Sequence, residues 1–143
     1  MKLKGRWWIS LYGPELKEQR VGNNVITQDG VSFVASFLGQ AAASATAFDM
    51  KYIAVGTDSS AEADTNTALG TEAARVEATV SNVTGAIYRL TATFTSGVAV
   101  GAITEYGVFS SATSGTMLSR DVEGVINVGT NDTLTAITEI TLS

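Results

Sequence analysis

The sequence contains no cysteine and no histidine, and this absence removes most of the side chains used for catalysis and metal binding. Histidine is the usual general base near neutral pH, so a Ser-His-Asp or Cys-His arrangement cannot be assembled. Cysteine and histidine are also the main protein ligands of zinc and copper. Without cysteine there is no disulfide bond, so stability must come from packing, strand pairing or assembly.

Charged residues and long apolar runs are also scarce. Charged residues make up 16% of the chain, against roughly 25% in an average globular protein. The longest apolar stretches are far shorter than the roughly 20 residues needed to span a bilayer, and the basic N-terminus lacks the apolar core of a signal peptide. We therefore expect a cytosolic product with no membrane partner, and its low-charge surface suits contact with other subunits.

The charge is unevenly distributed along the chain. Residues 1–20 hold five basic and two acidic residues, a net +3, whereas residues 21–143 hold four basic and twelve acidic residues, a net −8. The basic end could be an arm that reaches an acidic neighbour, including another copy, or a solvated edge strand whose lysines oppose aggregation. The pI of about 4.6 argues against a nucleic-acid partner.

Alternation of apolar and polar residues is the main secondary-structure signal, and it predicts strands at regular spacing. The predicted strands cover residues 2–12, 51–55, 74–81, 86–95, 103–109, 116–122, 125–128 and a last strand from Leu134 to Leu142. Residues 15–20 are polar and are predicted to be a loop. Seven or eight short strands joined by turns indicate an antiparallel sandwich or jelly roll.

One helix is predicted, near residues 28–38. Thr27 could cap its start and Gly39 its end, and Gly30 is a mild cost inside it. Val31, Val34, Ala35 and Leu38 would form the buried stripe. The expected fold is mostly β, an antiparallel β-sandwich or jelly-roll-like single domain over residues 1–143, with this short helix and a possible N-terminal arm at residues 1–20.

The adjacent Trp7 and Trp8 provide the clearest interface signal. In a strand, neighbouring side chains point to opposite faces, so one ring can enter the core while the other needs a different cover. Tryptophan is enriched at interface hot spots; the alternative is that Trp8 lies beneath a loop of the same chain. The candidate interface residues are Trp7, Trp8, Tyr12, Lys4 and Arg6, and the strand at residues 2–12 could pair with a neighbouring chain.

The remaining chemistry would have to come from carboxylates. A pair of them could act as in glycosidases, and the available residues are Glu72, Glu77, Glu105, Asp121, Glu123 and Glu139. Most fall where an outward strand face or a turn expects a charge, so this hypothesis ranks last. Asp58, Glu62 and Asp64 could bind calcium, but the loop lacks the glycine and terminal glutamate of an EF-hand. We therefore expect no enzyme activity, no catalytic residue, no cofactor and no metal; a solvated loop is favoured at residues 58–64, although ion binding there stays open.

Three stretches together resemble a known group of proteins. They are Tyr52–Thr57 (YIAVGT), Thr67–Glu72 (TALGTE) leading to Arg75, and Ile103–Phe109 (ITEYGVF) with Gly115–Arg120 (GTMLSR). In this order they resemble small structural proteins of tailed bacteriophage particles. The resemblance covers roughly residues 50–143 and consists of strand and turn patterns, so it carries over no functional residue.

The resemblance implies a non-enzymatic virion component made in the bacterial host cytoplasm, with a β-sandwich or jelly-roll-like body. Within the group we favour a capsid cement (decoration) protein that binds the outer shell and stabilises it. Its partners would be capsid or other virion proteins, and it would form a homo-oligomer, a dimer or a trimer. The alternative is a tail- or fibre-associated structural or receptor-binding module that binds carbohydrate through exposed aromatics; the candidates are Trp8, Tyr12, Tyr52, Tyr88 and Tyr106.

Overall fold

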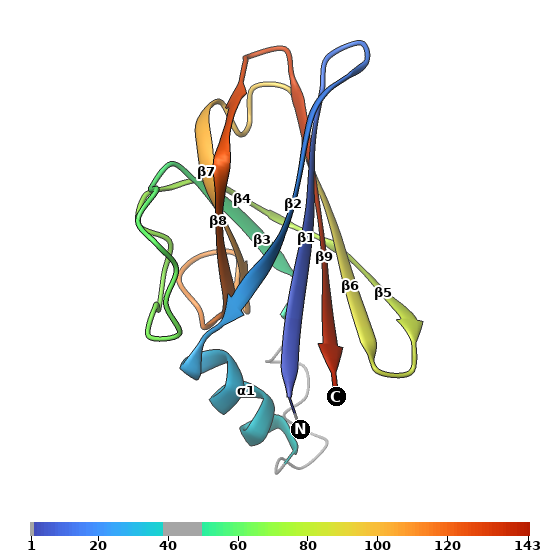
Figure 1. The fold of residues 1–143 in the computed structure, drawn as a ribbon, viewed down its shortest axis with the longest axis vertical. Coiled ribbons are helices and arrows are strands. Elements are labelled where there is room, and N and C mark those ends of the chain that lie inside the picture. The colour runs from blue at the N-terminus through green and yellow to red at the C-terminus, as the bar shows by residue number, and fades with distance from the viewer. Residues whose placement is uncertain (1, 39–49) are drawn as a thin grey trace.

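A computed structural model describes residues 2–38 and 50–143 and shows a mostly antiparallel β protein (Figure 1). The described strands are β1 (Leu3–Tyr12), β2 (Leu16–Ile26), β3 (Tyr52–Gly56), β4 (Glu72–Glu77), β5 (Thr79–Thr84), β6 (Ile87–Phe94), β7 (Gly101–Phe109), β8 (Met117–Val128) and β9 (Thr133–Leu142), with the helix α1 (Gln28–Leu38) between β2 and β3. The prediction of a mostly β chain with one short helix near residues 28–38 is confirmed for the described residues.

The strands form one curled sheet rather than a flat one. Their order is β4-β3-β7-β8-β2-β1-β9-β6-β5. The two outermost strands, β4 and β5, are consecutive in the chain and are separated only by Ala78. The same run of chain therefore pairs first with β3 and then with β6. This connection brings the two ends of the sheet together and produces a nearly closed, barrel-like shape.

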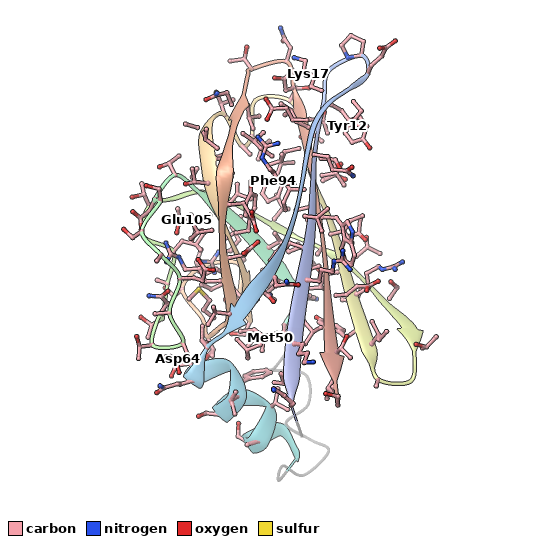
Figure 2. The ribbon with its side chains drawn as sticks, viewed as in Figure 1. Tyr12, Lys17, Met50, Asp64, Phe94 and Glu105 are labelled. Atoms are coloured by element: carbon pink, nitrogen blue, oxygen red, sulfur yellow. The ribbon has the colours of Figure 1, made fainter. Side chains whose placement is uncertain are left out.

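The apolar faces of the strands meet inside this curled sheet and form its core. On β9 the predicted alternation is confirmed, because Leu134, Ala136, Thr138 and Ile140 are all buried. Leu90, Ala92 and Phe94 are likewise buried on β6. Phe94 lies between the two sides of the sheet (Figure 2). Successive side chains of a strand point to opposite faces, so every second residue turns inward. The apolar surface of these inward residues is thereby removed from water.

The N-terminal region differs from its prediction in two ways. Residues 15–20 were expected to be a loop, but residues 16–26 form β2, whose inward positions are polar and so give no apolar alternation. Of residues 1–20, left open as a possible arm, residues 3–12 lie inside the sheet as β1. Over residues 5–12 this strand pairs with β2 on one edge and β9 on the other (Figure 1). Pairing of this strand with a second chain is therefore excluded in this fold.

The helix begins as predicted but packs through a different stripe. Thr27 caps it, since its hydroxyl accepts the Gly30 backbone N–H at 2.9 Å. Val31 and Ala35 were expected to be buried, but Val31 is 53% exposed and Ala35 is exposed as well. Phe33 and Val34 are half-buried, and Gly30 is the buried residue one turn earlier, so the stripe starts at Gly30 rather than Val31. The predicted Gly39 cap and the predicted loop at residues 40–48 lie outside the described residues.

Gly30 lets the helix backbone contact β8 directly. A Cβ at this position would lie 2.5 Å from the Leu118 carbonyl oxygen and 2.8 Å from its Cα, and both are backbone atoms. We therefore expect Gly30→Ala to destabilise the protein by about 1–2 kcal/mol, because overpacking outweighs the roughly 1 kcal/mol gain in helix propensity. Urea unfolding measures this change. Ser32→Ala, on the exposed side of α1, is the matched control and should be neutral or slightly stabilising; a stabilised Gly30→Ala protein would contradict the close contact.

Candidate functional site

Four of the five predicted interface residues lie on one outward sheet face. Lys4, Arg6, Trp8 and Tyr12 alternate with the buried residues of β1 and point away from the core. The register places Trp8 between Val21 of β2 and Ile137 of β9. We call this surface the Trp8 face. It comprises Lys4, Arg6, Trp8 and Tyr12 of β1, Val21 and Asn23 of β2, and Ile137, Glu139 and Thr141 of β9.

The centre of the Trp8 face is aromatic and apolar. The Arg6 guanidinium lies 5.0 Å from the centroid of the Trp8 ring, within the range of a cation–π interaction. Val21 is 47% exposed beside this ring, and Tyr12 is 40% exposed at the end of the strand. Stacking against an arginine orders the tryptophan but leaves its ring only half-buried. The ring is therefore available for contact with a partner.

A polar hollow of about 270 Å³ adjoins the ring. Its lining consists of Lys4, Gly5, Arg6, Trp8, Asn23, Glu139 and Thr141. The Glu139 carboxylate accepts a hydrogen bond from Arg89 Nε at 2.8 Å, so one wall of the hollow is held by β6. Gly5 is buried and its missing side chain leaves room for the Asn24 amide. The hollow presents cations, an amide, a carboxylate and an aromatic ring, which suits binding and supplies no nucleophile paired with a base.

Trp7, the fifth predicted interface residue, lies in the core. Its side chain is fully buried, and its ring centroid is 6.0 Å from that of Tyr106 on β7. The expectation that one tryptophan of the pair enters the core is therefore confirmed. In this fold only Trp8 can face a partner, because Trp7 points to the opposite side of β1.

Sequence reasoning missed a buried charge network on the other side of β7. Glu105 is fully buried and Arg120 is 2% exposed. Arg120 Nε donates to Glu105 Oε2 at 3.0 Å, and its Nη2 lies 3.0 Å from Asp58 Oδ2. These carboxylates were assigned to outward or solvated positions. The signal that could have found Glu105 is its place inside the otherwise uncharged strand ITEYGVF.

The network anchors the long loop between β3 and β4. The Glu105 carboxylate accepts the backbone N–H groups of Gly70 at 2.9 Å and Thr71 at 2.8 Å. Glu105, Arg120 and the Gly70-Thr71 pair all belong to the stretches that resemble phage structural proteins. In this chain those residues hold strands and a loop together.

Two of the three acidic residues of this loop, Asp58 and Asp64, form internal contacts. Asp58 accepts hydrogen bonds from Ser60 and Arg120, and these interactions, with that of Ser60 the largest, hold the pKa of Asp58 below its usual value. Asp64 accepts a hydrogen bond from Gln28 at 3.2 Å (Figure 2 shows the loop beside α1). Within residues 2–38 and 50–143 no group of three or more acidic side chains is arranged to hold a metal ion.

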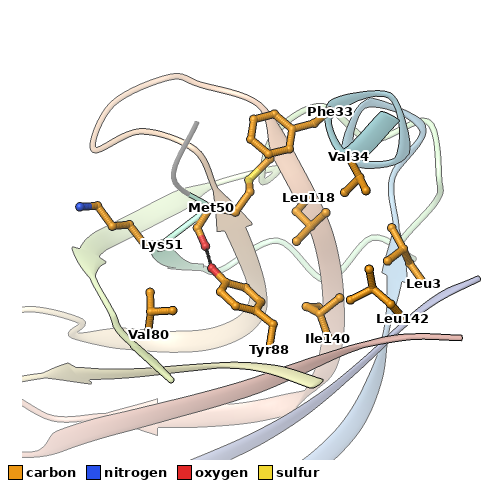
Figure 3. A pocket seen from close by; sticks show the side chains of 10 residues that line it. All are labelled: Leu3, Phe33, Val34, Met50, Lys51, Val80, Tyr88, Leu118, Ile140 and Leu142. Carbon is orange, nitrogen blue, oxygen red and sulfur yellow. Dashed lines mark hydrogen bonds between the residues drawn. The ribbon is translucent and has the colours of Figure 1, made fainter. Parts of the chain in front are cut away.

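A second, larger cavity of about 470 Å³ lies between α1 and the ends of several strands (Figure 3). Its walls are mostly apolar and include Phe33 and Val34 of α1, Leu118 of β8 and Ile140 of β9. The Tyr88 hydroxyl on its wall donates a hydrogen bond to the Met50 carbonyl. The described walls of this cavity can accept an apolar group.

In the part of the chain that the structure describes, no helix is long and apolar enough to cross a membrane. Comparisons with protein-family models, with curated proteins and with solved structures found no match.

Proposed function

We propose that this chain is a non-enzymatic structural protein of tailed-phage particles, a cement protein that binds the outside of the capsid shell through the Trp8 face. The observation that carries the proposal is the half-buried Trp8 with Arg6 stacked on it, at the centre of the Trp8 face. Tryptophan, tyrosine and arginine supply most of the energy in measured interfaces. We also propose that the body is a β-sandwich or jelly roll, as the resemblance implies.

The surroundings of Trp8 suit repeated binding to a lattice. The outward residues of β9 and β6 near it include Thr135, Thr141, Thr91 and Thr93, which are uncharged and can form hydrogen bonds with a partner. These threonines can be buried in an interface without adding charges to those of Lys4, Arg6 and Glu139. Modest contacts repeated over a shell bind tightly in total when the copies are also linked as a dimer or trimer.

The test measures binding of the protein to particles that have lost it. We expect Trp8→Ala to reduce capsid occupancy by about 100-fold at a fixed protein concentration, as for an interface hot spot. Val98→Ala, at a 42% exposed valine away from this face, is the matched control and should bind like the wild type. Unchanged occupancy of the Trp8→Ala protein would contradict binding through this face. Absence of the chain from particle heads in immunogold labelling would contradict the cement role.

The hollow beside Trp8 favours a second candidate, a tail- or fibre-associated carbohydrate-binding module. Sugars bind where an aromatic ring stacks on their apolar face and nearby amide, carboxylate and guanidinium groups meet their hydroxyls, and Trp8, Asn23, Glu139 and Arg6 supply these groups. Glycan-array binding by the wild-type protein that is lost on Asn23→Ala, together with labelling confined to tails, would favour this module over the cement protein.

A further inference from the structure

The pairing between β2 and β8 is unusually short for strands of their length. They contain 11 and 12 residues, yet in the described structure they pair only at Val25–Arg120 and Ile26–Ser119. Beyond this point the two strands diverge (Figure 1). We call the divergent part the β2–β8 seam; it comprises Glu18, Arg20 and Gly22 of β2 with Asp121 and Glu123 of β8.

Two carboxyl groups meet at this seam. A Cβ at Gly22 would overlap Glu123 Oε1 and would lie 2.9 Å from Asp121 Oδ2, so both oxygens crowd the space that the glycine leaves. Asp121 is 1% exposed, and its Oδ2 has no hydrogen-bond donor among the described residues. Two ionised carboxylates so close together repel each other, and one of them holds a proton instead.

The charged groups around the pair favour the protonated form. Asp121 and Glu123 are on β8, Glu18 and Arg20 are on β2, Tyr106 is on β7, and Glu62 lies in the loop between β3 and β4. Arg20 is the cation of this set, and its Nη2 is engaged by Glu18 Oε2 at 3.2 Å and by the Val125 carbonyl at 3.3 Å. Carboxylates therefore outnumber cations at the seam. The Tyr106 hydroxyl is buried beside Asp121 without a partner in the described residues, and it stays neutral because burial raises its pKa.

We propose that Asp121 and Glu123 share one proton in the closed sheet, and that loss of this proton opens the β2–β8 seam. Val25–Arg120 and Ile26–Ser119 are the only backbone pairs described between β2 and β8. Repulsion between the carboxylates therefore acts where the pairing of the sheet is shortest. The proposal is independent of the Trp8 face. It makes the seam a pH-sensitive point in a sheet that is otherwise continuously paired.

The pH range follows from the pKa of Asp121. Burial, with the neighbouring Glu123 and Glu62 charges, raises this pKa from 3.8 to about 7. In the unfolded chain the same carboxyl ionises near pH 4. The folded state therefore holds the proton over a range in which the unfolded state has lost it, and stability falls as pH rises from about 4 to about 7, then levels off. In the folded protein the seam itself should open as pH passes about 7.

Hydrogen exchange of the seam amides tests the proposal. After correction for intrinsic exchange rates, we expect protection in residues 18–26 and 119–126 to fall about tenfold between pH 6 and pH 8, a factor typical of a like-charge contact. Protection in residues 134–140 of β9 should not change. Asp121→Asn cannot ionise and should remove the pH dependence, whereas Glu72→Gln, at an exposed carboxylate, should behave like the wild type.

Two further measurements keep the proposal falsifiable if Asp121→Asn does not fold. Glu123→Gln removes the like charge beside Asp121 and should weaken the pH dependence of protection without abolishing it, because burial still raises the pKa of Asp121. Carbon-13 NMR of the wild-type side chains reports the carboxyl titrations directly, and a pKa near 4 for both residues would overturn the proposal. Equal protection of the seam amides at pH 6 and pH 8 in the wild-type protein would overturn it too, because the seam would then stay closed after loss of the proton.

Discussion

Replacing Glu105 by alanine is expected to lower the free energy of unfolding by about 3–5 kcal/mol, the cost of leaving a buried partner charge uncompensated. The fully buried Glu105 side chain would leave Arg120, which is 2% exposed, with Asp58 as its remaining carboxylate. It would also leave the backbone N–H groups of Gly70 and Thr71 without their acceptor. Chemical denaturation measures the loss.

Two controls separate the buried network from a general effect of losing a carboxylate. Glu77→Ala removes an ion pair with Lys51 (Nζ–Oε1, 2.9 Å) whose glutamate side chain is 58% exposed, and it should cost less than about 1 kcal/mol. In the double variant Glu105→Leu/Arg120→Met both charges are gone, so the loss should be smaller than the sum of the single losses. A Glu105→Ala protein as stable as Glu77→Ala would contradict the role of the network.

Trp7→Ala is the second change with a large expected effect. The Trp7 side chain is fully buried against Tyr106, and its removal leaves a cavity in a core that cannot collapse fully. We expect a loss of about 3–5 kcal/mol in the free energy of unfolding. Trp8→Ala, at the next position and on the opposite face, is the matched control and should cost about 1 kcal/mol or less. Equal losses for the two variants would mean that β1 does not present the faces described.

The strands with an apolar alternation could be predicted from the sequence because the signal is local. Over residues 90–94 of β6 and 134–140 of β9, every second residue is apolar or threonine and is buried, as the period of two requires. The helix start was equally local, since Thr27 caps residues only three positions away. The buried stripe of the helix could not be predicted in this way, because the close contact of Gly30 with Leu118 depends on a strand some 90 residues further along the chain.

The polar strand β2 shows why the rest could not be predicted. Its inward positions include Glu18, Arg20 and Asn24, which face Leu11, Ile9 and Gly5 of β1 across the register. The sequence LKEQRVGNN has no alternation of apolar and polar residues that would indicate a strand. This segment forms a strand because it pairs with β1. The same limit applies to residues 74–81, which alternate as one strand but divide at Ala78 between two neighbours.

The candidate interface could be predicted in part. The adjacent tryptophans identified β1 as the strand with one core and one outward ring, and Lys4, Arg6 and Tyr12 follow from the same alternation. Their partners on the Trp8 face, Asn23 and Glu139, come from strands that the register alone brings beside Trp8.

The sequence by itself determined the class of structure, because alternation and capping act between residues a few positions apart. It also excluded histidine- and cysteine-based chemistry through composition alone. Only the tertiary structure decided which carboxylates are buried. Glu105 reaches Gly70 and Arg120 across 35 and 15 positions of the chain, and Asp121 meets Glu123 in the space left by Gly22. The burial of a charge depends on what the fold brings to it: Gly70 and Arg120 reach Glu105, and Gly22 of β2 reaches the Asp121–Glu123 pair of β8, from distant parts of the chain.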